Sequence, residues 1–66
     1  MDDVVSTYYN PSGQIALVVK ESGNDHYSIE YYTSEGCMFH VEPFPGKSIF
    51  YVEDAAENWA CGRKKI

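Results

Sequence analysis

The side chains of this sequence that could bind a metal ion are two cysteines and two histidines. Cys37 and His40 are three residues apart, and Cys61 and His26 lie elsewhere in the chain. A Cys-x-x-His spacing is compatible with zinc, but residues i and i+3 of an extended strand point to opposite faces. We therefore predict no metal site and interpret both cysteines as small buried hydrophobic residues. A Cys37–Cys61 disulfide and a small metal-binding module are the alternatives.

The histidines and their neighbouring carboxylates could also do acid–base chemistry. The candidates are His26, His40, Asp25, Glu30 and Glu42. No nucleophile motif accompanies them, and a core of this size hardly forms a deep pocket. We therefore interpret both histidines as solvent-facing residues of a sheet and predict that the chain is not an enzyme.

Gly46-Lys47-Ser48 has the ending of a phosphate-binding P-loop. The full motif needs a glycine five residues before Gly46, where this chain has Val41, and it needs a helix next. We predict a strand after Ser48, so we interpret these residues as a tight turn and expect no cofactor.

Length and composition predict one small globular domain over residues 1–66. Hydrophobic residues make up 44% of the chain and aromatic residues 15%, which favours a β-rich core over disorder. The formal net charge of −5 argues against binding a nucleic-acid backbone. The sequence contains no apolar run of membrane-spanning length and no pattern of a signal peptide, so we expect a cytoplasmic protein with reduced thiols.

Short apolar runs separated by turn residues predict an antiparallel meander. Asn10-Pro11-Ser12-Gly13 is the clearest of these turns. The predicted strands cover residues 4–9, 14–21, 26–33, 37–42 and 48–52. The fold class is thus α+β, with four to five antiparallel strands and one short C-terminal helix packed on one face, and a small SH3-like or OB-like barrel is the alternative.

The C-terminal helix is predicted from its end signals. Asp54 and Glu57 match a capping box, and Gly62 suits the left-handed position after a helix. Such a short helix needs packing to be stable, and Trp59 is its predicted anchor in the core. The small residues on the same face as this tryptophan are Ala55, Ala56 and Ala60.

The strands are more apolar than one covered face requires. In the second strand, Ile15, Leu17 and Val19 point one way while Ala16 and Val18 point the other. The fourth strand alternates, with Cys37, Phe39 and Val41 opposite Met38, His40 and Glu42. In each of the pairs Tyr8-Tyr9 and Tyr31-Tyr32, one ring is predicted in the core and the other exposed. Because one short helix covers only one face, we expect the second face to meet another chain.

Two C-terminal segments, Phe44-Pro-Gly-Lys-Ser48 and Tyr51-Val-Glu-Asp-Ala-Ala-Glu-Asn-Trp59-x-x-Gly62, resemble small uncharacterised proteins of marine cyanobacterial phages. The resemblance covers the C-terminal third of the chain. It implies expression inside an infected bacterial cell and carries no activity, ligand or site residue.

The sequence therefore predicts a small, acidic, non-enzymatic protein-interaction module that associates with itself or another protein through its sheet, without nucleic acid or membrane. The predicted interaction surface consists of Val18, Tyr32 and Phe50. The alternative function is an acidic inhibitor that imitates nucleic acid and occupies a DNA-binding protein. The acids that would serve it are Glu21, Asp25, Glu30, Glu35, Glu42, Glu53, Asp54 and Glu57.

Overall fold

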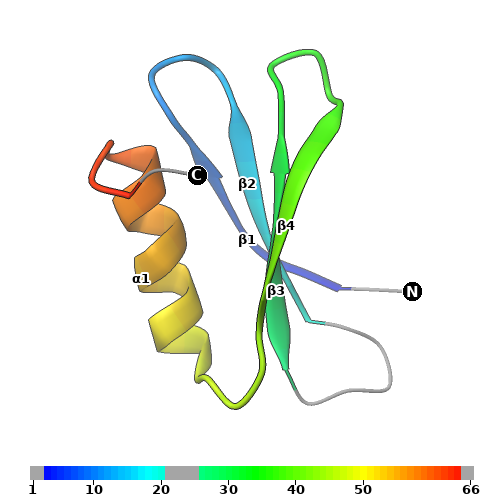
Figure 1. The fold of residues 1–66 in the computed structure, drawn as a ribbon, viewed down its shortest axis with the longest axis vertical. Coiled ribbons are helices and arrows are strands. Elements are labelled where there is room, and N and C mark those ends of the chain that lie inside the picture. The colour runs from blue at the N-terminus through cyan, green and yellow to red at the C-terminus, as the bar shows by residue number, and fades with distance from the viewer. Residues whose placement is uncertain (1–2, 21–25, 65–66) are drawn as a thin grey trace.

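The chain folds, in a computed structural model, as a four-stranded antiparallel sheet with one helix on one face (Figure 1). The structure describes residues 3–20 and 26–64. Its elements are β1 (Asp3–Tyr9), β2 (Ile15–Lys20), β3 (Tyr27–Tyr32), β4 (Met38–Phe44) and α1 (Ile49–Ala60). The strands lie in the order β1-β2-β3-β4, so β1 and β4 are the edges of an open sheet. The predicted α+β meander is confirmed, and the barrel alternative is wrong because the edge strands do not pair.

The turn between β1 and β2 forms as predicted. Asn10 accepts hydrogen bonds on Oδ1 from the backbone N–H groups of Ser12, at 3.1 Å, and Gln14, at 2.9 Å. Gly13 has a φ of 84°, a conformation that only glycine adopts without strain. The predicted turn at residues 22–25 lies outside the described residues.

The predicted fifth strand over residues 48–52 is wrong, because these residues begin the helix. The run Ile49-Phe50-Tyr51-Val52 consists of residues with high strand propensity. Packing of its apolar residues against the sheet nevertheless favours a helix. The residues that α1 turns towards the sheet are Ile49, Val52, Ala56 and Trp59, spaced by three or four along the chain. The helix is therefore 12 residues long rather than about two turns.

The N-cap of α1 is Ser48 and not Asp54. The Ser48 side chain accepts a hydrogen bond from the backbone N–H of Tyr51 at 3.3 Å. This bond satisfies one of the N–H groups that the first turn of a helix leaves free. Asp54 lies inside the helix, where it accepts from the Asn58 side chain at 3.3 Å.

The end of α1 agrees with the prediction. Gly62 has a φ of 81° and donates its N–H to the Trp59 carbonyl at 3.0 Å. Arg63 donates to the Asn58 carbonyl at 2.8 Å. This pair of hydrogen bonds is a Schellman motif, which satisfies the last carbonyls of the helix and turns the chain away from it.

Strand β4 continues two residues beyond its predicted end, through Pro43 to Phe44. Proline has no N–H to donate to a neighbouring strand, so it is tolerated where that position faces away from the sheet. The edge position of β4 provides this tolerance, and Pro43 lies opposite Ser28 of β3.

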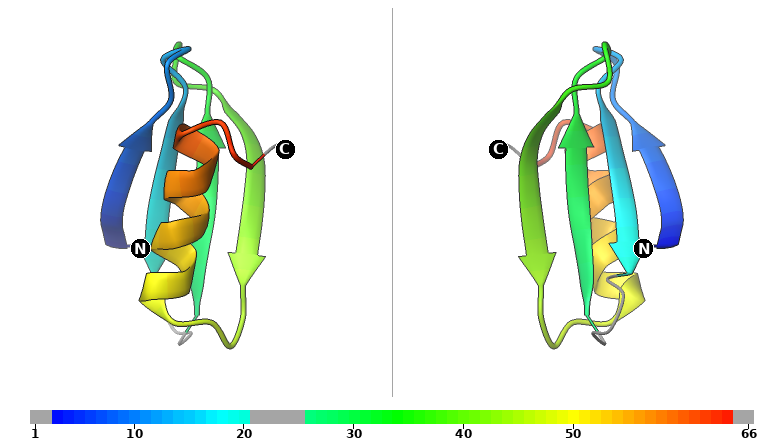
Figure 2. Two further views of the ribbon diagram at one scale, coloured as in Figure 1. Left: turned by 90° about the vertical axis from the view of Figure 1, so that its left-hand side faces the viewer. Right: turned by 90° about the vertical axis from the view of Figure 1, so that its right-hand side faces the viewer.

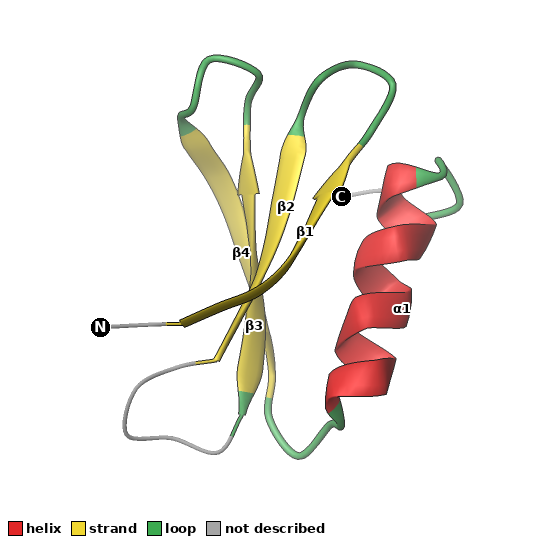
Figure 3. Cartoon of the chain, turned by 180° about the vertical axis from the view of Figure 1, so that it is seen from behind, coloured by secondary structure: helices red, strands yellow, loops and turns green. Residues whose placement is uncertain are grey.

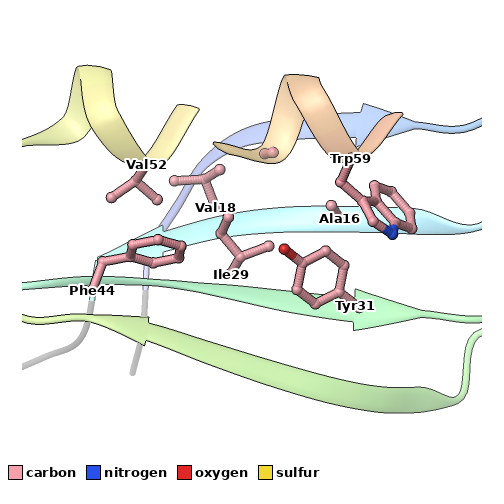
Figure 4. Packing of buried hydrophobic residues seen from close by; sticks show 8 residues of the cluster. Ala16, Val18, Ile29, Tyr31, Phe44, Val52 and Trp59 are labelled. Carbon is pink, nitrogen blue, oxygen red and sulfur yellow. The ribbon is translucent and has the colours of Figure 1, made fainter. Parts of the chain in front are cut away.

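The core lies between α1 and the face of the sheet towards which the helix packs (Figure 4). Val18 and Ile29 are opposite each other on β2 and β3, and both are fully buried. The Trp59 ring meets Tyr31 edge-on, with ring centroids 5.0 Å apart. Trp59 is thus the core residue that the sequence predicted, and its ring joins the last turn of the helix to the middle of the sheet.

Candidate functional site

The most distinctive surface of the molecule is the face of the sheet opposite α1. The helix packs against β1, β2 and β3 from one side only. The views of the two faces show the helix in front of the sheet on one side and bare strands on the other (Figure 2), and the view from behind shows the same separation (Figure 3). We call the bare side the outer face.

Strand register determines which side chains lie on the outer face, because directly paired residues share a face. Leu17 pairs with Thr7 on one side and with Glu30 on the other, and Glu30 pairs in turn with Val41. A second row of paired residues lies nearer the turns. Together the two rows form the outer patch, which consists of Thr7, Tyr9, Ile15, Leu17, Glu30, Tyr32, Met38 and Val41.

The outer patch is mainly apolar and open to solvent. Tyr9 is 65% exposed, and Met38 and Val41 are also exposed. Ile15 and Leu17 are partly buried between them. The patch ends where Val19 and Ser28, on the same face but nearer the other end of β2 and β3, are buried. The open apolar surface is therefore concentrated in the half of the outer face near the β1–β2 and β3–β4 turns, while the exposed Val4, which pairs with Val19, lies on the edge strand beyond it.

Glu30 is the one charged side chain of the outer patch. The Tyr32 hydroxyl donates a hydrogen bond to Glu30 Oε1 at 2.8 Å. This bond to the carboxylate, with a smaller effect of burial, raises the pKa of Tyr32. Tyr32 therefore presents a neutral ring whose polar end is already satisfied within the patch.

A β-bulge in β4 brings Met38 into the patch. Tyr31 pairs with His40 while Tyr32 pairs with Met38, so Phe39 is an extra residue without a direct partner. Simple alternation placed Met38 on the same side as His40 and Glu42. That assignment is wrong, because the bulge moves every residue before it to the opposite face.

The three residues of the predicted interaction surface do not share one surface. Tyr32 lies on the outer patch and is partly exposed. Val18 is fully buried beneath α1, so its assignment to an outward surface is wrong; its neighbour Leu17 occupies the outer position. Phe50 is 79% exposed but belongs to the first turn of α1 and not to the sheet.

Beside Phe50, the start of α1 has a second aromatic surface. The Tyr51 ring meets Phe44 edge-on, with centroids 6.0 Å apart, and Lys47 Nζ lies 4.9 Å from the Tyr51 centroid. The Lys47 ammonium thus makes a cation–π contact with Tyr51. The helix after Gly46-Lys47-Ser48 corrects the predicted strand, although Val41 still occupies the position where a P-loop needs glycine.

The described thiols and imidazoles do not gather into a metal site. Cys37 and Cys61 are both free and exposed, so the prediction of buried cysteines is wrong. His40 is exposed, with its ring centroid 5.5 Å from that of Tyr31. Within residues 3–20 and 26–64, no three His, Cys, Asp or Glu side chains are grouped so that they could hold a metal ion.

The candidate acid–base residues do not all share one face. Glu30 is on the outer face, whereas His40 and Glu42 pair with residues of the helix-covered face. Glu42 Oε1 accepts from the Tyr31 hydroxyl at 3.1 Å and from Lys64 Nζ at 2.6 Å. Burial, together with the Glu42 carboxylate, raises the pKa of Tyr31. This network joins the segment after α1 to β4 and has a structural role, and Asp25 lies outside the described residues.

The described acids are spread over several parts of the molecule rather than one face. Glu53, Asp54 and Glu57 are on the helix, Glu30 is on the outer face, and Glu35 is in the β3–β4 turn. On the helix side, Ser6 Oγ donates a hydrogen bond to Glu53. Nearby, burial and the carboxylates of Glu53 and Glu57 raise the pKa of Tyr8. A nucleic-acid mimic needs its charges aligned on one surface, and Glu21 and Asp25 lie outside the described residues.

Comparisons with known proteins add no further assignment. No protein-family model, curated protein or solved structure matches the chain. The resemblance to phage proteins therefore stays a prediction. Within the part of the chain that the structure describes, no helix is long and apolar enough to cross a membrane.

Sequence reasoning found the second apolar face but missed several of its residues. The alternation along the second strand would assign Leu17 to the outer face once it is known which side of the strand the helix covers. The bulge that presents Met38 has no glycine or proline signal in residues 38–40.

Proposed function

We propose that this chain is a small, non-enzymatic protein-interaction module that associates with a second copy of itself through the outer patch. The observation that carries the proposal is the set of exposed apolar side chains on the outer face, including Tyr9, Met38 and Val41. Burying apolar surface is favourable, and the largest connected apolar patch of a soluble protein is often functional.

The position of the outer patch on an uncovered sheet face supports a second copy as the partner. Two similar sheets pack face to face about 10 Å apart, with side chains of both inner faces interdigitating. A two-fold axis makes such a contact self-complementary and closes the assembly at a dimer. In this arrangement the two helices form the outer layers and the two sheets form the centre.

The size of the patch supports a weak and reversible dimer. Four strands about 4.8 Å apart, with three or four residues each at about 3.3 Å, span roughly 19 by 10–13 Å. A specific interface of standard size buries about 800 Å² on each partner, so a contact confined to this patch lies below that class. We therefore expect association in the micromolar range or weaker.

The alternatives receive less support. Of the described residues that could serve an enzyme, Glu30 lies on the outer face and His40 and Glu42 lie on the other, and the described acids do not share one surface. The free, exposed thiols of Cys37 and Cys61 suit a reducing compartment such as the cytoplasm, where exposed cysteines persist without pairing.

Sedimentation equilibrium over about 10 µM to about 1 mM tests the proposal. We expect the mean mass to rise from the 7.5 kDa of one chain towards twice that value. Tyr32→Glu should hold the protein at the monomer mass, because it places a second carboxylate beside Glu30 in the contact. Phe50→Glu is the matched control, since it makes the same aromatic-to-glutamate change on α1 and should leave association unchanged.

A strictly monomeric wild type over this range contradicts the proposal. If Phe50→Glu abolishes association and Tyr32→Glu does not, the contact surface lies at the start of α1 instead. Circular dichroism spectra of both variants confirm that each one is folded at the concentrations compared.

A further inference from the structure

The only charge within the outer patch stands near its middle. Glu30 has Leu17 on one side and Val41 on the other as directly paired neighbours. Its one hydrogen bond in the patch comes from the Tyr32 hydroxyl, on its own strand and the same face. A carboxylate between two aliphatic side chains is an unfavourable group to remove from water.

We infer that Glu30 limits the self-association of this chain, so that the outer patch forms a dimer that tightens when this carboxylate is neutralised. The inference rests on the proposed function, since it concerns the same patch and the same partner. By two-fold symmetry each dimer takes two Glu30 side chains out of water, and the two charges repel each other.

Among the described residues, the outer patch holds no cation that could compensate Glu30. The titratable groups that share the outer patch with it are Tyr32 on β3 and Tyr9 on β1, and its directly paired neighbours are Leu17 on β2 and Val41 on β4. None of these side chains carries a positive charge. The hydroxyl of Tyr32 donates one hydrogen bond to the Glu30 carboxylate but does not neutralise its charge.

The position of Glu30 in the contact predicts how the dimer association constant changes with pH. Neutral Glu30 is compatible with a buried, apolar contact, and ionised Glu30 is not, so association takes up protons. We therefore expect a tighter dimer at about pH 5 than at about pH 7.5, where carboxylates are ionised. Each dimer contains two Glu30 carboxylates because of its two-fold axis. The association constant of a weak dimer should therefore change strongly when both carboxylates are neutralised.

The test compares dimer association constants of the wild type, Glu30→Gln and Glu57→Gln by sedimentation equilibrium. Glu57 is exposed on α1, away from the outer patch, so Glu57→Gln makes the same change in net charge elsewhere. At about pH 7.5 we expect Glu30→Gln to tighten the dimer about tenfold or more, and Glu57→Gln to change it by less than about threefold.

Measuring the same association constants at two pH values distinguishes protonation of Glu30 from the general loss of net charge near the isoelectric point. Wild type and Glu57→Gln should associate more tightly at about pH 5 than at about pH 7.5, and Glu30→Gln should lose most of this dependence. If all three proteins dimerise equally at both pH values, the inference is overturned and the proposed function stands. If all three stay monomeric, the proposed function itself is wrong. Should Glu30→Gln fail to fold, an unchanged wild-type association constant between the two pH values would still overturn the inference.

Discussion

The two faces of the sheet have similar side chains and different environments. On β2, Val18 is fully buried beneath the helix, while the adjacent Leu17 lies on the outer face between Thr7 and Glu30. On β3, Tyr31 packs against Trp59, while the adjacent Tyr32 stays partly exposed. The comparison shows that the number of apolar residues in the strands indicates how much apolar surface there is to cover. The position of the helix determines which face of the sheet is covered within the chain.

The same substitution on the two faces should have very different consequences, and this is the largest effect we expect. Val18→Asp places an unpaired charge in the core, which costs several kcal/mol and should unfold so small a domain. Leu17→Asp should lower the free energy of unfolding of the monomer by only about 1–2 kcal/mol, because the site is partly open to solvent although it faces Glu30, and it should abolish association. Urea denaturation with sedimentation analysis measures both, and equal destabilisation by the two variants would remove the distinction between the faces.

The helix offers a second matched pair of aromatic residues. Trp59 is 6% exposed and fills the space next to Tyr31, whereas Phe50 is 79% exposed. Trp59→Ala should lower the free energy of unfolding by about 3–5 kcal/mol, as truncation of a buried ring does. Phe50→Ala should change it by about 0.5 kcal/mol or less. A large loss in the free energy of unfolding from Phe50→Ala would contradict the exposed position of this ring in the single chain.

Alkaline pH should distinguish the tyrosines of the two faces. The raised pKa of Tyr31 means that this hydroxyl stays protonated in the folded protein when the unfolded chain ionises near pH 10. The unfolded state then binds fewer protons, so stability present below pH 10 is lost as pH rises, by up to about 1.4 kcal/mol per pH unit.

Thermal denaturation between about pH 9 and pH 12 measures this loss in the wild type and two variants. Tyr31→Phe should remove most of the slope. Tyr32→Phe should remove less, because its ring lies on the open face and its pKa is raised mainly by the bond to Glu30. An equal response of both variants would contradict the difference in environment.

The smallest effect concerns the start of the helix that covers the inner face. Ser48→Ala removes the N-cap hydrogen bond to Tyr51 and should lower the free energy of unfolding by about 1 kcal/mol. Asp54→Ala should cost about 0.5 kcal/mol or less, because Asp54 makes one exposed contact with Asn58 within the helix. Chemical denaturation of both variants tests this order, and a larger loss from Asp54→Ala would restore the capping box that the sequence predicted.

Local signals in the sequence predicted the elements whose ends depend on single residues. Gly13 and Gly62 have the positive φ values that their turn and helix end require, and the four strands lie within two residues of their predicted limits. The start of the helix was missed because Ile49-Phe50-Tyr51-Val52 has strand propensity, and contact with the sheet outweighed it. Its spacing to Ala56 and Trp59 was the signal that could have found it.

The candidate surface was predicted in kind but not in detail. The excess of apolar residues on the strands was visible, and it correctly indicated a second, uncovered face. Which side of β2 the helix covers depends on the whole fold, so Val18 was chosen where Leu17 lies on the outer face. The bulge at Phe39 depends on pairing with β3 and could not be derived from β4 alone.

A dilution series of ¹H–¹⁵N and methyl NMR spectra tests the central claim most directly, because it locates the contact residue by residue. We expect concentration-dependent shifts at Ile15, Leu17, Tyr32 and Val41, and constant positions for Val18 and Trp59 within the core. Shifts confined to the helix, or spectra that do not change up to about 1 mM, would contradict the assignment of the outer patch as the surface through which this chain associates.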